Sequence, residues 1–337
     1  MMKRILLIAN YKPGTGGISG QVEKLHYYLD KEGVENFVFS IRGSLLSRLI
    51  APIKLVRVAK DYDVLHVHTC SHWGFVTTVL GVWAGKWQKK KVVVTYHGGG
   101  AEQFFSRHPR LVKKYLCQTD ANVVLSGFLG SVFDKYKIPH IIIPNIIELE
   151  EGRFRIRNRV EPKFVSVRTL SPLYNIECIL RAFKIVKEQY NSATLTIVGD
   201  GPSKEKLEQM VNSEDIRDVV FVGRVENSRI YEYLDQSDIM LTSPRIDNMP
   251  VSVLEGFNAG LLVISSNVGG VPYMIEHGRT GLLFESDKDS DLAERIIWAL
   301  KNQKESIQMI WNAKEEVGKY SWGKIRKEIL SVYECDK

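Results

Sequence analysis

Cysteine pairs and long apolar runs are what this chain of 337 residues lacks. Its four cysteines show no CxxC or zinc-like spacing, which argues against a disulfide framework or a structural metal site and indicates reduced thiols. The longest apolar stretch, residues 73–87, is broken by three glycines and is shorter than the ~20 residues that span a bilayer, so it predicts a buried helix. The cysteines are Cys70, Cys117, Cys178 and Cys335.

An export signal is also missing from the N-terminus. Lys3 and Arg4 precede an apolar run, residues 5–9, that is shorter than the ~7 to 15 residues of a signal peptide, and the run predicts a buried first strand. We therefore expect a cytoplasmic protein.

Acidic residues are scarce in the first half of the chain. Residues 1–150 carry 20 Lys and Arg against 11 Asp and Glu, whereas residues 151–337 carry 26 against 28. One interpretation is solvated helix faces. The other is peripheral contact with an anionic membrane that carries lipid-linked sugar diphosphates, because Leu46, Leu49 and Ile53 lie beside these bases at helical spacing. A nucleic-acid partner is not expected.

Short β-branched runs alternate with helical patterns in both halves, which is typical of βαβ units and parallel sheets. We predict an α/β protein with two Rossmann-like, doubly wound domains. Expected strands cover residues 5–9, 37–40, 64–68, 92–95, 123–126 and 141–143 in the first half. In the second they cover residues 163–167, 194–198, 219–222, 239–241, 263–265 and 281–284.

The join between the domains falls where the polar stretch after Pro144 and Asn145 lacks apolar periodicity. We place the first domain at residues 1–148 and the second at 149–305. Residues 306–337 are expected to be C-terminal helices that pack back toward the first domain.

The segment SPRIDNMPVSVLE, residues 243–255, follows an expected strand and opens a helix. Asp247 or Asn248 is expected to cap that helix, with Pro250 in its first turn. Free N–H groups of the first turn can hold a diphosphate. Glu255 follows Ser252 by three residues, so both lie on one helix face, where the carboxylate can accept bonds from a ribose diol.

The second half resembles the nucleotide-binding domain of the retaining glycosyltransferases of family 4, which have the GT-B fold. The resemblance includes "LTIVGDGPSKEKLE" and "SDIMLTSPRIDNMPVSVLEGFNAGLLVISSNVGGVPYMIEHGRTGLLF". It implies two facing domains with a cleft between them and a nucleoside-diphosphate sugar as donor. The sequence does not specify the base, and we favour UDP over GDP. In that family two glutamates with seven residues between them flank the donor, and the second holds the ribose. The matching text assigns these roles to Asp247 and Glu255.

Two features depart from the family pattern. Asp247 stands where a longer glutamate is usual, and Thr169 and Tyr174 stand where an arginine and a lysine usually balance the departing diphosphate. That charge must still be met, and Arg168, one place away, is our candidate. We assign Asp247, His97 and Arg168 to catalysis and expect neither a metal nor a cofactor. The expected donor-binding residues are Gly16, Gly17, Tyr174, Gly199, Gly201, Gly223, Arg224, Asn248, Met249, Pro250, Val251, Ser252 and Glu255.

Several of these assignments keep an alternative. Gly199, Gly201 and Gly223 could serve only as turn residues, and Arg168 could belong to a structural ion pair.

In the first half, the loop KPGTGGISG follows the first strand, but it lacks the dinucleotide-binding spacing, which disfavours a nicotinamide enzyme. The resemblance implies that Gly16 and Gly17 face the donor phosphates and that His97 contacts the donor sugar. His66 and His68 alternate on one strand without a carboxylate or cysteine cluster, so a metal site there is disfavoured.

The resulting prediction is a retaining, metal-independent glycosyltransferase of cell-surface polysaccharide or glycolipid synthesis. Its partners would be a nucleotide-sugar donor and a glycan or polyprenyl-linked acceptor. Two rivals are a nucleotide-sugar 2-epimerase of the same fold and a catalytically silent partner of another transferase.

Overall fold

The computed structural model describes residues 3–334, apart from the side chain of residue 45, and divides them into two compact units. Unit 1 comprises the chain up to Ile146 and again from Trp322 onward, and unit 2 comprises Ile147–Ser321. The sequence analysis placed the divisions after residues 148 and 305. The structure instead groups residues 306–321 with unit 2.

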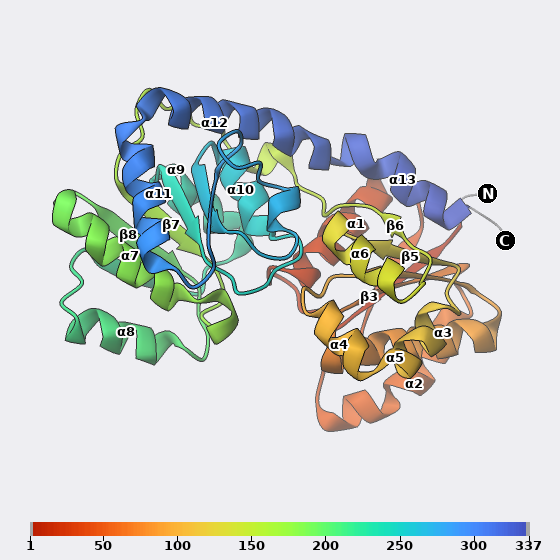
Figure 1. Ribbon diagram of the computed structural model, residues 1–337. Helices are drawn as coiled ribbons and strands as arrows, with labels where there is room; N and C mark the ends of the chain where they lie inside the picture. Colours follow the sequence, from red (N-terminus) through yellow and green to blue (C-terminus); the bar gives the residue numbers. More distant parts are fainter. Residues whose placement is uncertain (1–2, 335–337) are drawn as a thin grey trace. The chain divides into compact units, whose positions relative to one another are not determined.

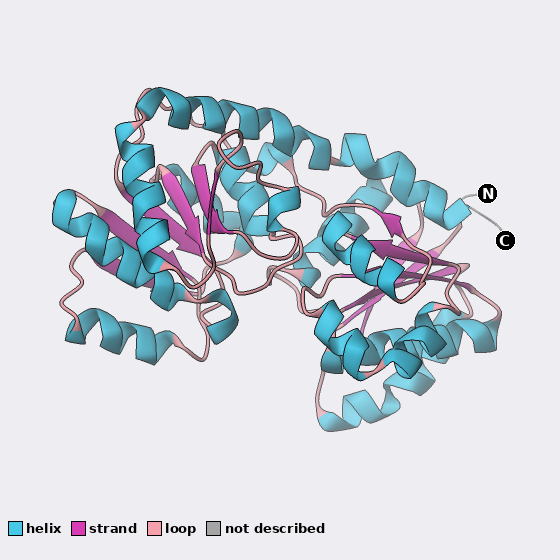
Figure 2. Ribbon diagram, viewed as in Figure 1, coloured by secondary structure: helices cyan, strands magenta, loops and turns pink. Residues whose placement is uncertain are grey.

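Unit 1 is a six-stranded parallel sheet with helices on both faces (Figures 1 and 2). Its strands are β1 (Ile5–Ala9), β2 (Asn36–Ser40), β3 (Val64–Thr69), β4 (Lys91–Tyr96), β5 (Ala121–Val124) and β6 (Ile141–Ile142). Its helices are α1 (Ile18–Lys31), α2 (Leu45–Ala59), η1 (His72–Phe75), α3 (Val76–Gln88), α4 (Ala101–Arg107), α5 (Pro109–Leu116), α6 (Gly127–Lys135) and α13 (Trp322–Glu334).

The strand order β2-β1-β3-β4-β5-β6 decides which helices cover which face. The chain steps from β1 to β2 in one direction and returns to β3 in the other, and right-handed crossovers then put α1 on one face and α2 to α6 on the opposite face. Leu55 of α2 and Val82 of α3 accordingly share one core cluster with Leu65, whereas Leu25 of α1 shares another with Val64. The α1 face would be only half covered by α1.

Helix α13, from the far end of the chain, covers the rest of that face. Ile325 and Ile329 pack in the same cluster as Leu25. Trp322 lies parallel to the ring of Tyr28, with centroids 5.0 Å apart, and its Nε1 donates a 2.9 Å hydrogen bond to Glu32 Oε1. The burial of this apolar surface explains why α13 belongs to unit 1.

Unit 2 is a second six-stranded parallel sheet, in the order β12-β11-β10-β7-β8-β9. Its strands are β7 (Lys163–Val167), β8 (Thr194–Val198), β9 (Val219–Gly223), β10 (Ile239–Thr242), β11 (Leu262–Ser266) and β12 (Leu282–Phe284). Its α-helices are α7 (Ile176–Gln189), α8 (Lys204–Ser213), α9 (Ile230–Asp235), α10 (Val251–Ala259), α11 (Asp289–Lys301) and α12 (Gln303–Val317). Its short 3-10 turns are η2 (Leu149–Glu151), η3 (Pro172–Tyr174), η4 (Asn227–Arg229), η5 (Val271–Tyr273) and η6 (Gly318–Tyr320).

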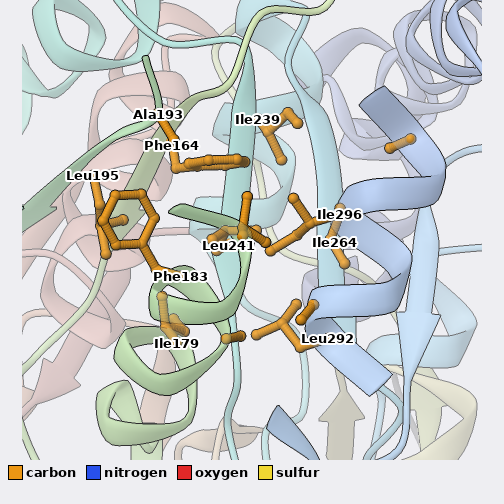
Figure 3. Packing of buried hydrophobic residues seen from close by; sticks show 14 of the residues in the cluster. Phe164, Ile179, Phe183, Ala193, Leu195, Ile239, Leu241, Ile264, Leu292 and Ile296 are labelled. Carbon is orange, nitrogen blue, oxygen red and sulfur yellow. The ribbon is translucent and has the colours of Figure 1, made fainter. Parts of the chain in front are cut away.

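The main core of unit 2 lies between the sheet and helices α7 and α11. Figure 3 shows Phe164 of β7 and Phe183 of α7 within this cluster, beside Leu241 of β10 and Ile296 of α11. The rings of Phe164 and Phe183 pack edge to face, with centroids 5.9 Å apart, and hold α7 against the middle of the sheet. The expected α/β class with two doubly wound parallel sheets is thus confirmed.

One helix differs from its expected burial. Residues 73–87 do form helical structure, in η1 and α3, but Trp73, Trp83 and Trp87 are 91%, 43% and 69% exposed. Only the side of α3 that holds Val82 and the small residues Gly81 and Ala84 meets the sheet. The prediction of a buried helix was therefore wrong for the outer side, because apolar content alone does not show how many sides of a helix are covered.

No helix within residues 3–334 combines the length and the apolar character needed to cross a bilayer. Cys70, Cys117 and Cys178 are free thiols, and Cys335 lies outside the described residues.

Candidate active site

Each sheet reverses its strand order beside its first strand, and open parallel sheets bind ligands at the carboxyl ends of the strands where this reversal occurs. In unit 2 the reversal lies between β7 and β10, and in unit 1 between β1 and β3. The residues that directly follow these strands are therefore the first place to look for a site.

In unit 2, Arg168 follows β7 and meets Asp247 from the loop after β10. The Arg168 Nη2 donates a 2.8 Å hydrogen bond to Asp247 Oδ2, and Nε donates a 3.3 Å bond to Thr242 Oγ1. The two charged side chains are only 11% and 17% exposed. The structure thus brings together two residues that the sequence analysis assigned to catalysis.

Tyr174 completes this cluster. The Arg168 guanidinium carbon lies 4.8 Å from the centroid of its ring. Burial raises the pKa of the Tyr174 phenol, while the guanidinium of Arg168 acts in the opposite direction. Tyr174 therefore supports the flat side of the guanidinium as a neutral phenol and leaves the edge of the guanidinium for hydrogen bonds.

The start of α10 corrects one expectation. Neither Asp247 nor Asn248 caps the helix, because the N-cap is Pro250, with extended ψ and no side-chain hydrogen bond. Asp247 Oδ1 instead accepts a 2.8 Å bond from the N–H of Asn248, while its other oxygen is held by Arg168. The first turn of α10 consequently has no side-chain cap, and its leading N–H groups can meet an anionic ligand.

The residues around this helix start differ in burial. Asn248, Met249 and Ser252 are 0%, 6% and 7% exposed, whereas Val251 and Glu255 are partly exposed. The Ser252 Oγ has no hydrogen-bond partner among the described residues. The spacing of Ser252 and Glu255 puts both on one side of α10, as the sequence predicted.

Two expected glycines pack against the turn that holds Arg168. Gly199 has φ +147°, and a Cβ at this position would overlap the carbonyl oxygen of Arg168. A Cβ on Gly201 would overlap the carbonyl oxygen of Leu170. Both glycines therefore let the turn after β8 lie against the turn after β7.

Gly223 and Arg224 lie at the end of the edge strand β9, two strands from β7. The Gly223 carbonyl accepts a 2.9 Å bond from the N–H of Gly199, and the side chain of Arg224 is exposed. The structure does not join these two residues to the Arg168 cluster by any described contact, which favours a turn role for Gly223.

Sequence reasoning missed a second polar cluster beside the first. Arg245 Nη2 donates a 3.1 Å bond to Asn175 Oδ1 and lies 2.8 Å from Asp287 Oδ1, and Asn175 also bonds Asp287. These contacts tie the loop after β10 to η3 and to the loop after β12. The available signal was an asparagine directly before an expected helix, since asparagine tolerates the left-handed backbone that Asn175 adopts, φ +45°.

In unit 1, Gly16 and Gly17 lie in the loop between β1 and α1. Gly17 is the N-cap of α1 with φ +65° and ψ −133°, and the helix start has no side-chain cap and no acidic residue in its first turn. Glu23 Oε1 accepts a 2.8 Å hydrogen bond from the N–H of Gly14 and so holds the loop against α1. The loop thus presents a second uncapped helix N-terminus, in a conformation that favours glycine.

His97 follows β4 and contacts His68 of β3, with 3.0 Å between His97 Nε2 and His68 Nδ1. Burial lowers the pKa of His97 to about 3 and lowers that of His68 well below its usual range. His97 is therefore a neutral imidazole at physiological pH.

No group of three or more His, Cys, Asp or Glu side chains within residues 3–334 is arranged to hold a metal ion.

Comparisons with known proteins identify the family of the chain. Residues 15–151 match the model described as Glycosyltransferase Family 4, and residues 150–316 match the model described as Glycosyl transferases group 1. The chain belongs to glycosyltransferase family 4.

One curated relative and two solved structures are similar to this chain. The chain is 27% identical over 300 residues to N-acetyl-alpha-D-glucosaminyl L-malate synthase of Bacillus anthracis, covering 83% of this chain and 76% of the relative. HepE of Anabaena in complex with UDP-glucose has a TM-score of 0.81 at 16% identity, covering 98% of this chain and 99% of the other. Sucrose-phosphate synthase of Thermosynechococcus elongatus has a TM-score of 0.82 at 18% identity, covering 98% of each chain.

The expected GT-B fold is confirmed, and this family 4 protein is a glycosyltransferase of the GT-B type.

Proposed function

We propose that this glycosyltransferase moves a sugar from a UDP-sugar to a glycan or lipid-linked acceptor, with retention of the anomeric configuration. The observation that carries this proposal is the cluster of Arg168, Tyr174 and Asp247 beside the uncapped start of α10. It combines a cation, an uncapped helix N-terminus and a carboxylate at the strand reversal of unit 2. The UDP-glucose bound to Anabaena HepE supports the choice of UDP.

Charge develops on the diphosphate as the sugar leaves, and two features of unit 2 can stabilise it. The leading N–H groups of α10 supply the positive end of a helix dipole. The Arg168 guanidinium supplies a cation, and its position is fixed by Thr242 and the Tyr174 ring. We infer that this pair replaces the usual arginine and lysine, and that turnover needs no metal.

In the retaining reaction that we propose, the acceptor hydroxyl attacks from the side of the leaving group. A phosphate oxygen of the donor takes the hydroxyl proton, so no protein base is required. Asp247 then lies near the transferred sugar, and Glu255 accepts bonds from the ribose hydroxyls.

Binding of nucleotides tests the donor first. Thermal unfolding is measured in EDTA with UDP, GDP, ADP, CMP and NAD, where a ligand at 100 times its Kd adds ~2.7 kcal/mol of stability. We expect a selective rise with UDP. A higher unfolding temperature with GDP alone would identify the donor as a GDP-sugar. No change with any nucleotide would favour the interpretation as a catalytically silent partner.

Product analysis tests the reaction. Incubation with a UDP-sugar and an acceptor mixture is followed by NMR of the product, which we expect to be α-linked from an α-linked donor. A β-linked product would contradict retention. Release of an isomeric sugar without acceptor would instead indicate an epimerase.

We also propose that unit 1 contacts an anionic membrane surface through an aromatic–basic face on α2 and α3. Helices α2 and α3 cover the same side of the sheet, so the outer sides of both point away from it. Between residues 42 and 91 the chain has nine Lys and Arg against two Asp. The aromatic–basic face comprises Leu46, Leu49, Ile53, Lys54, Arg57 and Lys60 of α2 and its end, and Trp83, Lys86, Trp87 and Lys89 of α3 and its end.

The exposure of this face is large for apolar side chains. Leu46, Leu49 and Ile53 are 69%, 67% and 58% exposed, and the rings of Trp83 and Trp87 lie 6.0 Å apart. Apolar groups that enter the acyl boundary beside bases that attract anionic lipid, each worth ~1 kcal/mol, are typical of interfacial helices. A lipid-linked acceptor would lie in the same membrane.

Flotation with lipid vesicles tests this contact. We expect vesicles containing anionic lipid to retain the protein at low salt, and Trp83→Ser with Trp87→Ser to weaken retention by on the order of tenfold. The matched control is Trp298→Ser with Trp311→Ser in unit 2, where the two side chains are 40% and 42% exposed. Equal loss in the control, or no retention of the wild type, would contradict the proposal.

A further inference from the structure

The three histidines His66, His68 and His97 line a pocket in unit 1. It lies on the face that α1 and α13 cover, and it has room of about 40 Å³, enough for a water molecule. No charged side chain lines it. The remaining lining residues are Gln21, Leu25, Val93, Thr95, Val123, Leu125, Ile143, Pro144, Asn145, Ile146, Ile329, Val332 and Tyr333.

The polar lining of this pocket is almost fully paired. His66 Nδ1 lies 2.8 Å from the Tyr333 hydroxyl, and His66 Nε2 lies 2.7 Å from Thr95 Oγ1. Gln21 bonds the backbone of Ile146 through both its oxygen and its nitrogen, at 2.7 and 3.0 Å. None of these bonds involves His68 Nε2.

His68 differs from its neighbours in having one nitrogen without a partner. Its side chain is 4% exposed, its Nδ1 contacts His97 Nε2 at 3.0 Å, and its Nε2 has no hydrogen-bond partner among the described residues. His97 Nδ1 likewise has no bond within residues 3–334, but the His97 ring is partly exposed. A single proton joins His68 Nδ1 and His97 Nε2 in this hydrogen bond. If His97 supplies that proton, its Nδ1 is an acceptor, and if His68 supplies it, His97 Nδ1 is a donor.

The two possible arrangements are unequal. If His97 donated to His68, the proton of His68 would lie on Nε2, and this N–H would have no acceptor among the described residues that line the pocket. If His68 donates, its unpartnered Nε2 is only an acceptor. Buried N–H groups without a partner are rarer than unpaired acceptors, because the lost hydrogen bond costs more.

We infer that His68 is a positioning residue, which donates from Nδ1 to His97 Nε2 and thereby holds His97 in the tautomer with its proton on Nδ1. His97 then presents a hydrogen-bond donor on its exposed side and cannot act there as a base. The tautomer of an imidazole is set by the bond that its other nitrogen makes. The catalytic part of this inference rests on the proposed function and on the expectation from the family resemblance that His97 contacts the donor sugar.

Tyr333 connects this arrangement to α13. Its bond to His66, 267 residues away in the chain, fixes the ring that packs against His68 with centroids 4.4 Å apart. The end of the chain thus helps to hold the His68 ring in the plane that reaches His97.

The test is ¹⁵N NMR of protein labelled at its eight histidines, with His97 assigned from the His97→Gln spectrum. At pH 7.5 we expect His97 to be neutral, with Nδ1 protonated and Nε2 unprotonated. His68→Asn keeps an N–H near the position of Nδ1 and should preserve this pattern. His68→Leu has no donor and should reverse or average it, and a thermal unfolding curve checks that this variant folds.

A proton on Nε2 of His97 instead of Nδ1 would overturn the inference. It fails if wild-type His97 carries its proton on Nε2, or if His68→Leu leaves the His97 pattern unchanged.

Activity gives a separate readout. We expect His68→Leu to lower kcat/KM for the donor by on the order of tenfold, as for a lost hydrogen bond, and His68→Asn to restore most of it. If the NMR pattern changes as expected while kcat/KM does not, the tautomer assignment stands and the proposed contact of His97 with the donor fails.

Discussion

The strand order of each unit has one reversal, yet the residues at the carboxyl ends of the strands differ in charge between the two units. Unit 2 keeps charged groups there, with Arg168 and Asp247 joined at 2.8 Å. Unit 1 keeps the imidazoles of His68 and His97 there, and burial lowers the pKa of His97 to about 3 and that of His68 well below its usual range. A buried charge persists only with a partner, whereas a buried histidine can lose its proton instead.

This difference suits the two units to different parts of a nucleotide-sugar. Charged groups and an uncapped helix suit a diphosphate, and neutral donors suit sugar hydroxyls. The units have in common a helix start without a side-chain cap, at Gly17 before α1 and at Pro250 before α10.

Removal of the cation from unit 2 should have the largest effect. We expect Arg168→Ala to lower kcat by roughly 100- to 1,000-fold, as for loss of one group that stabilises developing charge. Steady-state kinetics with a UDP-sugar would measure it, and Arg168→Lys, which keeps the charge but not the planar fork, should recover part of the rate. Unchanged turnover of the alanine variant would show that the ion pair with Asp247 is only structural.

The ribose contact proposed for Glu255 gives the next largest effect. A hydrogen bond to a charged acceptor is worth ~1.5 to 3 kcal/mol. We therefore expect Glu255→Gln to weaken UDP binding by about tenfold or more. Calorimetry with UDP and 2′-deoxy-UDP provides the control, since the wild type should prefer UDP and the variant should discriminate less. Equal discrimination in both proteins would remove Glu255 from the ribose.

Glycine substitutions compare the two loops directly. Gly199→Ala combines φ +147° with overlap on the Arg168 carbonyl, and we expect it to destabilise the protein by about 3 kcal/mol and to lower activity. Gly17→Ala has φ +65° but open space around it, so strain alone should cost about 1 to 2 kcal/mol. Denaturant unfolding measures both. A larger loss in Gly17→Ala would reverse the order that the packing implies.

The buried histidines of unit 1 predict a pH dependence of stability. The folded-state pKa of His66 is about 3, below its unfolded value of ~6.5, so between these values only the unfolded state binds the proton. Stability should therefore fall as the pH falls below 6.5, by ~1.4 kcal/mol per pH unit for this residue. His66→Gln should reduce the slope by that amount and leave it unchanged above pH 7.5. An identical slope in both proteins below pH 6 would contradict the neutral state of His66.

Most of the fold could be predicted from local pattern. The expected runs all appear as strands in the expected order, since buried parallel strands show continuous β-branched residues. The outer side of α3 could not be predicted, because Trp83 and Trp87 occur in an apolar run whether or not a partner covers them.

The candidate site was only partly visible in the sequence. Arg168 and Asp247 were each chosen from sequence, but their ion pair joins residues 79 positions apart and exists because β7 and β10 are neighbours in the sheet. His68 was considered only for a metal. Its alternation with His66 put it on one sheet face, and only the pairing of β3 with β4 brought it to His97.

By itself the sequence determined which segments are strands, which loops carry glycine or polar groups, and which family motifs stand at which residues. These follow from side-chain periodicity and backbone preference over a few neighbouring positions. Only the tertiary structure decided that Asp247 pairs with Arg168 instead of capping α10, that α13 packs with α1 on one face of the unit 1 sheet, and that Tyr333 bonds His66. The physical reason is that these features depend on which distant surfaces bury one another, and no local pattern contains that information.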